Sequence, residues 1–466
     1  MCGIFGIVSN ESVAPKISIG LLGLQHRGEQ GIGVVTSDGA EIQEHRDEGL
    51  VAEVFNDKNR ETLFSKLSGN FGIGHTLYST IGKKGETKQP RAYQPLVGEF
   101  RGQPFALGHN GNLIELEGLR KEAEAKGYKF HSEFSDTEVI VALLSTSPEK
   151  DFLEALCKVL PRLKGAFALT ILFKDKVIGV RDGYGIRPIC LGRDPTSFIL
   201  ASEESAFRAL EASFIREVQP GEVVVLGRNG IENSFIWAEN PQLRFCIFEY
   251  IYFARPDSRL AGQRVNSYRE NAGWAVAIEH PVEADIVCSV PESGEIYNYS
   301  IAQALKIPVR KGILRSRYFT TRAFMASRDA DRRALARKKF YILREVVHEK
   351  RVVIAEDSLV RADTSPEVTA MLREAGANEV HLRVGSSPLR WPCFFGIDIP
   401  TRAELAAAGL TEEEVGRKIV HSDSIGYLSL DGMVKASGLP RKNLCLGCFI
   451  GPEGYPIELP PEVINS

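Results

Sequence analysis

The sequence predicts two domains: an α+β sandwich of antiparallel strands, followed by an α/β domain built on an open parallel sheet. The chain has 466 residues, which is too long for one hydrophobic core, so two domains of about 200 residues are expected. Up to about residue 240, short strand-type runs are separated by turns, whereas the later part alternates apolar strands with helices. The boundary is therefore expected between residues 235 and 245.

In the first domain, many strands with few helices are typical of an α+β sandwich. Helices are expected around 116–127 and 135–147, and strands at 3–8, 32–39, 71–80, 105–113, 166–173, 176–183 and 198–202. In the second domain, residues 284–309 and 350–385 show the βαβ pattern of a parallel sheet. There, the strand 351–357 leads through a loop into a helix over 365–376, which ends at Gly376.

The composition excludes several classes of partner. The hydrophobic fraction of 43% and the charged fraction of 25% are ordinary for a globular protein. A net charge of −3 gives no electrostatic basis for binding nucleic acid or a membrane surface. Neither an apolar run of about 18 residues nor a signal peptide is present. We therefore expect a cytoplasmic protein without a nucleic-acid or membrane partner.

Cys2 is the first candidate catalytic residue. One interpretation is a buried first strand whose second residue happens to be cysteine. The other is that Met1 is removed, because cysteine is small enough to permit trimming. Cys2 would then carry a thiol and a free α-amine, and the amine can act as the base for its own thiol.

Eight cysteines occur in the chain, and in a reducing compartment their even number does not imply disulfides. Cys445 and Cys448 form a C-x-x-C, which suits a metal, a cluster or a redox pair. Taken from the residues alone, a structural zinc site is the preferred interpretation.

Several motifs in order along almost the whole chain give it a specific resemblance. They are MCGIFGIV at 1–8, LQHRG at 24–28, HNGNL at 109–113, SDTEV at 135–139, IFEYIYFARPDS at 247–258, PCFFGID at 392–398 and DSIGYLSLDG at 423–432. The chain resembles the amidophosphoribosyltransferase family of purine synthesis. This resemblance implies a class II glutamine amidotransferase domain of the N-terminal-nucleophile type at 2–240, and a type I phosphoribosyltransferase domain at 241–466. It also implies that ammonia from glutamine displaces pyrophosphate from phosphoribosyl pyrophosphate, and, by analogy, a dimer or tetramer.

The resemblance assigns roles in the first domain. Cys2 matches the family's nucleophile, and Asn110 and Gly111 fall where the family places the oxyanion hole, whose fixed donors stabilise developing charge. HNGN alone would favour a tight hairpin turn. Asp136 matches the acid that binds the α-ammonium group of glutamine, although an acid there could also simply complement a helix dipole.

In the second domain, Glu356 and Asp357 match the acids that hold the ribose hydroxyls, and they form a possible magnesium site. The remaining substrate-binding residues implied by the resemblance are Ser293 of the pyrophosphate loop and Ser358, Thr364 and Ser365 of the phosphate loop.

Four cysteines fall on positions that ligate a [4Fe–4S] cluster in cluster-containing members: Cys246, Cys393, Cys445 and Cys448. Four thiolates suit either a [4Fe–4S] cluster or Zn²⁺. The resemblance to cluster-containing members favours the cluster. Because these positions span 246–448, the cluster is expected to be structural. Cys157, Cys190 and Cys288 are expected in the core.

Three segments depart from the family pattern. Leu77 stands where the family has the arginine that grips the α-carboxylate of glutamine, and leucine has no donor. Ala362 and Asp363 replace Gly-Thr in the phosphate loop, where Asp363 would repel the phosphate or, alternatively, point outward as an N-cap. The lid at 316–325 is one residue longer than the family's and lacks its glycine.

Three functional hypotheses follow from this pattern. The chain is an ordinary amidophosphoribosyltransferase with tolerated substitutions, or a repurposed paralogue that acts on another amide, nucleotide or nucleoside bond. The third hypothesis is a non-catalytic regulatory homologue.

Overall fold

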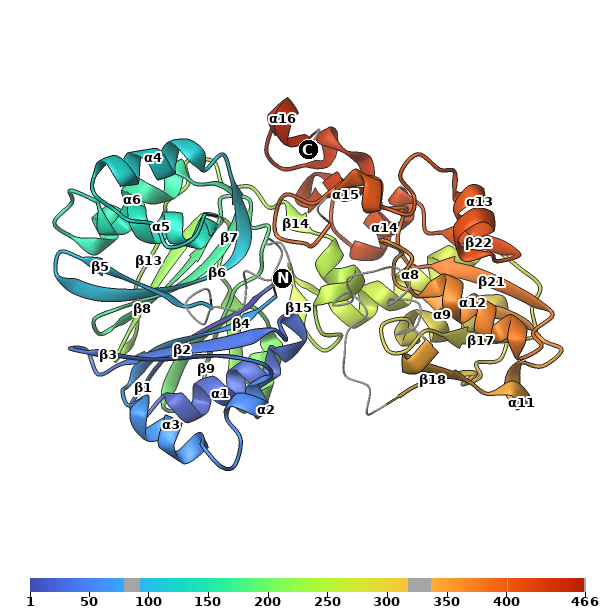
Figure 1. Cartoon of the computed structure of the whole chain (residues 1–466), viewed down its shortest axis with the longest axis horizontal. Coiled ribbons are helices and arrows are strands. Elements are labelled where there is room, and N and C mark those ends of the chain that lie inside the picture. Colours follow the sequence, from blue (N-terminus) through green and yellow to red (C-terminus); the bar gives the residue numbers. More distant parts are fainter. Residues whose placement is uncertain (79–92, 134, 317–336, 400, 465–466) are drawn as a thin grey trace. The chain divides into compact units, whose positions relative to one another are not determined.

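Two compact units make up the computed structural model, which describes residues 1–78, 93–133, 135–316, 337–399 and 401–464 (Figure 1). The first unit contains 1–246, 257–262 and 393–398, and the second contains 247–256, 263–392 and 399–466. The expected boundary after residue 240 lies shortly before the observed division at Cys246. Two later segments, 257–262 and 393–398, were not expected in the first unit.

Two antiparallel sheets form the centre of the first unit. The seven-stranded sheet has the order β11-β9-β10-β1-β4-β2-β3. Its strands are β1 (Gly3–Ser9), β2 (Gly31–Ser37), β3 (Ile42–Glu48), β4 (Phe71–Leu77), β9 (Cys190–Arg193), β10 (Ser197–Ala201) and β11 (Ser213–Glu217). The six-stranded sheet has the order β13-β12-β8-β7-β6-β5. Its strands are β5 (Leu96–Phe100), β6 (Gln103–Ile114), β7 (Lys164–Phe173), β8 (Lys176–Arg181), β12 (Glu222–Gly227) and β13 (Gly230–Ile236).

Alternation along β1 explains how these sheets form four layers. Ile4 and Val8 point into the core between the sheets, whereas Phe5 and Ile7 point into the core beneath the helices. Helices α1 (Ala14–Gly23), α2 (Val51–Val54), α3 (Arg60–Lys66) and α7 (Glu204–Ala209) cover the seven-stranded sheet, and α4 (Glu117–Ala125), α5 (Asp136–Ser145) and α6 (Phe152–Val159) cover the other (Figure 1). This arrangement confirms the predicted α+β sandwich.

The second unit contains a four-stranded parallel sheet in the order β17-β20-β21-β22. Its strands are β17 (Ile286–Ser289), β20 (Arg351–Glu356), β21 (Glu379–Val384) and β22 (Ser424–Tyr427). Helix α12 (Ser365–Glu374) packs Val368 and Leu372 against one face. The other main helices are α8 (Val265–Glu279), α9 (Glu295–Leu305) and α14 (Leu430–Ser437), and β18 (Ile313–Arg315) pairs with β19 (Phe340–Ile342).

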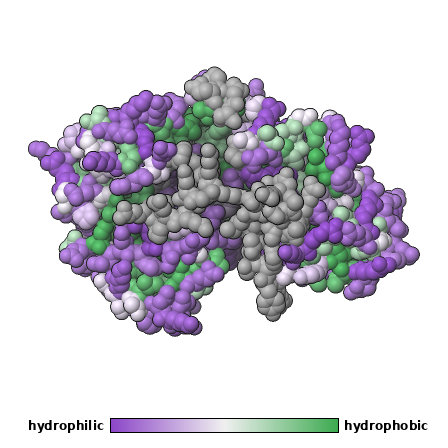
Figure 2. Space-filling model, in the orientation of Figure 1, coloured by the Kyte–Doolittle hydropathy of each residue, from purple (hydrophilic) through white to green (hydrophobic). Residues whose placement is uncertain are grey.

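The remaining strands and α-helices of the described chain are short. They are β14 (Phe245–Cys246), β15 (Arg259–Leu260), β16 (Gln263–Arg264), β23 (Leu444–Cys445), α11 (Arg344–Val347), α13 (Glu412–Glu414), α15 (Gly447–Ile450) and α16 (Pro461–Ile464). On the face drawn in Figure 2, hydrophilic side chains predominate and hydrophobic ones are scattered in small patches. Within the described ranges, every helix is too short or too polar to cross a membrane.

Candidate active sites

Cys2 lies immediately before β1, at the end of the strand ladder between β1 and β4. The Gly3 N–H donates to the Thr76 hydroxyl at 3.1 Å. The Cys2 sulfur lies 3.5 Å from the Tyr78 nitrogen and 3.6 Å from the Tyr78 oxygen. The thiol is therefore held against the main chain that follows β4, and its side chain remains partly exposed.

Asn110 is bound to Cys2 through its amide oxygen and keeps its amide nitrogen available. The Cys2 N–H donates to Asn110 Oδ1 at 3.3 Å. Asn110 is only 1% exposed, and its Nδ2 has no hydrogen-bond partner in the described chain. A buried unpaired donor is costly, so this N–H is available for an anionic atom formed beside the thiol.

Gly111 occupies a place that only glycine fits. Its φ is +155°, and a Cβ there would lie 1.9 Å from the Ala166 oxygen on β7. HNGN therefore lies within β6, paired with β7, rather than in the hairpin turn that the motif alone would favour. The long strand pairing overrides the local turn preference of Asn-Gly.

Asp136 begins α5 and lies beside a buried histidine that was not singled out from the sequence. The Leu113 N–H donates to Asp136 Oδ2 at 3.0 Å, and His109 Nδ1 is 3.5 Å from the same oxygen. Burial opposes the protonation of His109, but the Asp136 charge, the hydrogen bond to Asp136 and the contact with the Ala166 oxygen together outweigh it and raise the pKa of His109. Burial favours the neutral form of Asp136, but the His109 charge and the hydrogen bonds from His109, Leu113 and Thr137 together lower its pKa. His109 could have been found as the first residue of HNGN.

A second missed residue, Arg27 of the LQHRG motif, supports the Cys2 backbone. Its Nε donates to the Cys2 oxygen at 3.2 Å, and its guanidinium pairs with Glu203, both side chains being fully buried. Ser258 donates to Glu203 at 2.8 Å. A buried pair with its hydrogen bonds satisfied fixes orientation, so this network holds the residue that carries the thiol.

Leu77 ends β4 opposite Gly31 and is partly exposed. The Gln30 N–H donates to the Leu77 oxygen at 3.1 Å. On the other side, a Cβ at Gly28 would lie 2.6 Å from the Leu77 carbonyl carbon. The main chain here is fixed from both sides, so the side chain at position 77 can differ without a change in the backbone.

In the second unit, the two predicted ribose-binding acids lie at the end of β20, Glu356 as its last residue and Asp357 directly after it, and both are buried. Ser365 donates to Glu356 at 2.9 Å, and Ser358 donates to Asp357. Burial raises the pKa of both carboxyls, and the neighbouring Asp357 charge adds to the rise at Glu356; hydrogen bonds from Ser293 and Ser358 oppose the rise at Asp357. The structure thus brings Ser293 and Ser358 to Asp357, and Ser365 to Glu356.

The phosphate loop contains a strained residue. Ala362 has a φ of +56°, in the left-handed region that favours glycine. The N-cap of α12 is Thr364, which makes no side-chain cap hydrogen bond. Asp363 therefore precedes the cap position, which contradicts the alternative that it is the N-cap. Of the lid expected at 316–325, only Ser316 lies within the described residues.

All eight cysteines are free of disulfides. Cys246 and Cys393 belong to the first unit, whereas Cys445 and Cys448 belong to the second. Within the described ranges, no three or more His, Cys, Asp or Glu side chains are grouped as metal ligands.

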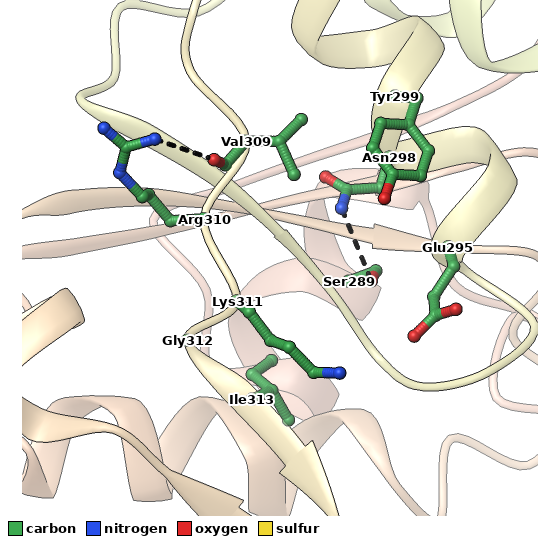
Figure 3. Close-up of a pocket in the computed structure, with 9 residues that line it drawn as sticks. All are labelled: Ser289, Glu295, Asn298, Tyr299, Val309, Arg310, Lys311, Gly312 and Ile313. Atoms are coloured by element: carbon green, nitrogen blue, oxygen red, sulfur yellow. Dashed lines mark hydrogen bonds between the residues drawn. The ribbon is translucent and has the colours of Figure 1, made fainter.

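A small pocket of about 160 Å³ lies between α9 and the segment before β18 (Figure 3). Asn298 directs its amide nitrogen toward the Ser289 hydroxyl at 3.5 Å, and Lys311 extends from the other side. None of the site residues predicted from the sequence lines it.

Comparison with known proteins identifies the family of the chain. A model of the glutamine amidotransferase domain family matches residues 84–209. The chain is 41% identical to the amidophosphoribosyltransferase of Methanocaldococcus jannaschii over 98% of both chains, and 39% identical to that of Bacillus subtilis over 98% of this chain and 94% of the relative. The solved glutamine phosphoribosylpyrophosphate amidotransferase of B. subtilis, complexed with ADP and GMP, superposes with a TM-score of 0.89 at 36% identity and covers 99% of each chain.

A second solved structure, described as the allosteric regulatory enzyme of purine biosynthesis, superposes with a TM-score of 0.90 at 37% identity over 99% of this chain and 98% of that one. These findings confirm the predicted fold class, an N-terminal-nucleophile amidotransferase domain followed by a phosphoribosyltransferase domain. The chain belongs to the amidophosphoribosyltransferase family.

Proposed function

We propose that the chain takes the amide nitrogen of glutamine and transfers it to C1 of phosphoribosyl pyrophosphate, giving phosphoribosylamine, glutamate and pyrophosphate for purine synthesis. The observation that carries this proposal is the geometry at Cys2. The residue's nitrogen is bound to Asn110 Oδ1, and the unpartnered Asn110 Nδ2 remains as a donor. The near full-length similarity to amidophosphoribosyltransferases supports it.

In the first half-reaction, the Cys2 thiolate attacks the amide carbon and the carbonyl oxygen becomes an oxyanion. Asn110 Nδ2 and the Gly111 main chain supply the donors that stabilise it. The thiol proton passes to the α-amine freed by removal of Met1 and then to the leaving nitrogen, so that ammonia departs. Water hydrolyses the thioester to glutamate and restores the thiol.

Asp136 is suited to the α-ammonium group of the donor because it is held ionised within the first unit. The opposite end of the amino acid is bound weakly, because Leu77 offers no donor to the α-carboxylate. An ordinary family reaction with a high KM for glutamine is therefore expected.

In the second half-reaction, Glu356 and Asp357 accept hydrogen bonds from the ribose hydroxyls. Thr364 donates its hydroxyl to the 5′-phosphate, and Ser365, whose hydroxyl is bound to Glu356, donates its main-chain N–H at the start of α12. Ammonia attacks C1, and the C1–oxygen bond to pyrophosphate breaks. We propose that Mg²⁺ binds with the donor at the two acids, where two adjacent buried carboxylates favour a cation. Bound there, it would neutralise charge on the leaving pyrophosphate.

We also propose that Cys246, Cys393, Cys445 and Cys448 hold a structural [4Fe–4S] cluster. Contacts within the second unit support the choice of ligands. The Arg390 and Trp391 N–H groups donate to the Cys448 oxygen at 3.0 and 3.1 Å, beside the chain that leads into Cys393. The Phe248 and Phe449 rings, which follow Cys246 and Cys448, lie 6.5 Å apart between centroids. The proposal requires the four thiols to converge when iron and sulfide are supplied.

Anaerobic reconstitution tests the cluster. The wild type and Cys157→Ser, a control outside the ligand set, should bind the iron and sulfide of one cluster per chain. Cys445→Ser should bind much less. Zinc retained in place of iron by the wild type would support the alternative zinc site.

The function is tested with chain from which Met1 has been removed. Glutamate and pyrophosphate release should both depend on glutamine, phosphoribosyl pyrophosphate and Mg²⁺. Cys2→Ala should abolish glutamine-dependent pyrophosphate release and retain release driven by ammonium salts. Failure of the wild type to release pyrophosphate with either nitrogen source would refute the proposal.

We propose further that the enzyme acts in the reducing cytoplasm, as its free thiols favour, and as a homo-oligomer. Light scattering at micromolar concentration should give the mass of a dimer or tetramer, and the monomer mass of 51.4 kDa would contradict that assignment.

A further inference from the structure

A segment from the far end of the sequence lies against the main chain of Gly111 in the first unit. Gly396 of the segment 393–398 has a φ of +103°, and a Cβ there would lie 2.8 Å from the Gly111 oxygen and 2.9 Å from its carbonyl carbon. Beside it, Asn112 Nδ2 donates to the Phe394 oxygen at 2.9 Å. The segment therefore contacts the residues on both sides of the Gly111–Asn112 peptide bond.

Hydrogen bonds and buried side chains hold the segment 393–398 in this contact. Arg187, which is fully buried, donates through Nε to the Phe395 oxygen at 2.8 Å, and its Nη2 donates to the same oxygen. The Phe395 side chain is 1% exposed and that of Ile397 is 6% exposed. Moving the segment would break these bonds and uncover apolar surface.

Gly111 is equally confined on its other side. It pairs with Phe167 in the ladder between β6 and β7, and its own α-carbon faces the Ala166 oxygen. The Gly111 main chain is thus confined between β7 and Gly396, one residue after Asn110.

We propose that Gly396 and the hydrogen bond from Asn112 to Phe394 are positioning elements for the oxyanion of amide hydrolysis. They fix the Gly111 main chain relative to the Cys2 thiol without touching the substrate. The inference rests on the proposed amidase function of Cys2 and adds the segment 393–398, which is distant from Cys2 in the sequence. Because oxyanion donors act through fixed geometry, a displacement of a few tenths of an ångström reduces their effect on the transition state more than on substrate binding.

Gly396→Ala tests the proposal, with Gly102→Ala as the matched control. Gly102 also has a positive φ, +77°, and it precedes the same strand, but a Cβ there would meet nothing within 4 Å. Both variants therefore impose backbone strain, and only Gly396→Ala presses on Gly111. We expect Gly396→Ala to lower kcat for glutamine hydrolysis about tenfold to a hundredfold, with little change in KM, and Gly102→Ala to behave as the wild type.

Two further readouts separate positioning from general damage. Alkylation of Cys2 by iodoacetamide proceeds by direct displacement and forms no oxyanion, so its rate should be unchanged in Gly396→Ala. Ammonia-dependent pyrophosphate release should also be retained. A loss of alkylation parallel to the loss of hydrolysis would overturn the proposal, as would an unchanged kcat.

Asn112→Asp provides an independent variant of similar size that removes the donor to Phe394 and places a carboxylate beside its oxygen. It should show the same fall in kcat with unchanged alkylation, and wild-type hydrolysis in this variant would also count against the proposal. Absence of amidase activity in the wild type itself would instead refute the proposed function, so the two failures are distinguishable.

Discussion

Replacing Leu77 with arginine should restore binding of the α-carboxylate of glutamine. The Leu77 main chain is fixed between Gln30 and Gly28, so an arginine there starts from an unchanged backbone. The side chain is partly exposed, which leaves room for a longer one. A guanidinium at this point can bind a carboxylate through two parallel hydrogen bonds.

The size of the effect follows from this partial exposure. A charge-assisted hydrogen bond contributes about 1.5–3 kcal/mol, and solvent screening reduces the Coulomb part of an exposed pair. A net gain of about 2–3 kcal/mol corresponds to a KM for glutamine roughly 30–150-fold lower, since about 1.4 kcal/mol is tenfold. Because the carboxylate is remote from the scissile amide, kcat should change little.

The assay follows glutamate release from glutamine and from 4-aminobutanamide, which is glutamine without its α-carboxylate. The wild type and the uncharged control Leu77→Met should have similar KM values for the two amides. For Leu77→Arg, the KM for glutamine should be roughly 30–150-fold lower than the KM for 4-aminobutanamide. Equal KM values for glutamine in Leu77→Arg and the wild type would refute the reasoning, because the missing contact would then not be at this position.

Three further outcomes are expected. Asn110→Ala should lower kcat for glutamine hydrolysis about 10²–10³-fold, as loss of an oxyanion donor does, and leave ammonia-dependent pyrophosphate release intact; a normal rate would remove Asn110 from the mechanism. Ala362→Gly should relieve left-handed strain and stabilise the second unit by up to about 1 kcal/mol, measured as slower hydrogen exchange in α12, and faster exchange would contradict this. The pKa of His109 is raised in the folded protein, so the pairing of His109 with Asp136 stabilises the fold fully below the ordinary histidine pKa of about 6.5. This stabilisation is lost as the pH rises through the pKa of His109 in the folded protein. The stability difference between the wild type and His109→Gln should therefore be larger at pH 6 than at pH 9, and a constant difference would mean that His109 is not charged.

Local sequence patterns were sufficient to predict individual strands and helices. The strand before Glu356, the helix that ends before Gly376 and the first strand after Cys2 all follow from periodicity and termini. HNGN shows the limit of such reasoning, because its local preference is a turn and its place in β6 is set by pairing with distant residues.

The membership of 257–262 and 393–398 in the first unit could not be predicted for a similar reason. Hydrophobic patterning shows that Phe395 is buried somewhere, but not that Arg187 binds its oxygen. In the candidate sites, residues within motifs were predicted, whereas His109 and Arg27 gain their roles only from the partners that the fold brings to them, Asp136 and Glu203.

Burial of Met1 limits when the proposed activation of Cys2, the removal of Met1, can take place. Met1 is 1% exposed, and its sulfur contacts the buried Arg187. An aminopeptidase needs an accessible end, so the removal of Met1 that the proposed mechanism requires is expected before β1 is enclosed between β4 and β10. The strand β10 ends at Ala201. At about 5–20 residues per second, synthesis of the chain as far as this strand takes roughly 10–40 s, and this is the time available for removing Met1. A chain that folds with Met1 in place should stay inactive when the peptidase is added later, and it should regain activity only if it is unfolded first.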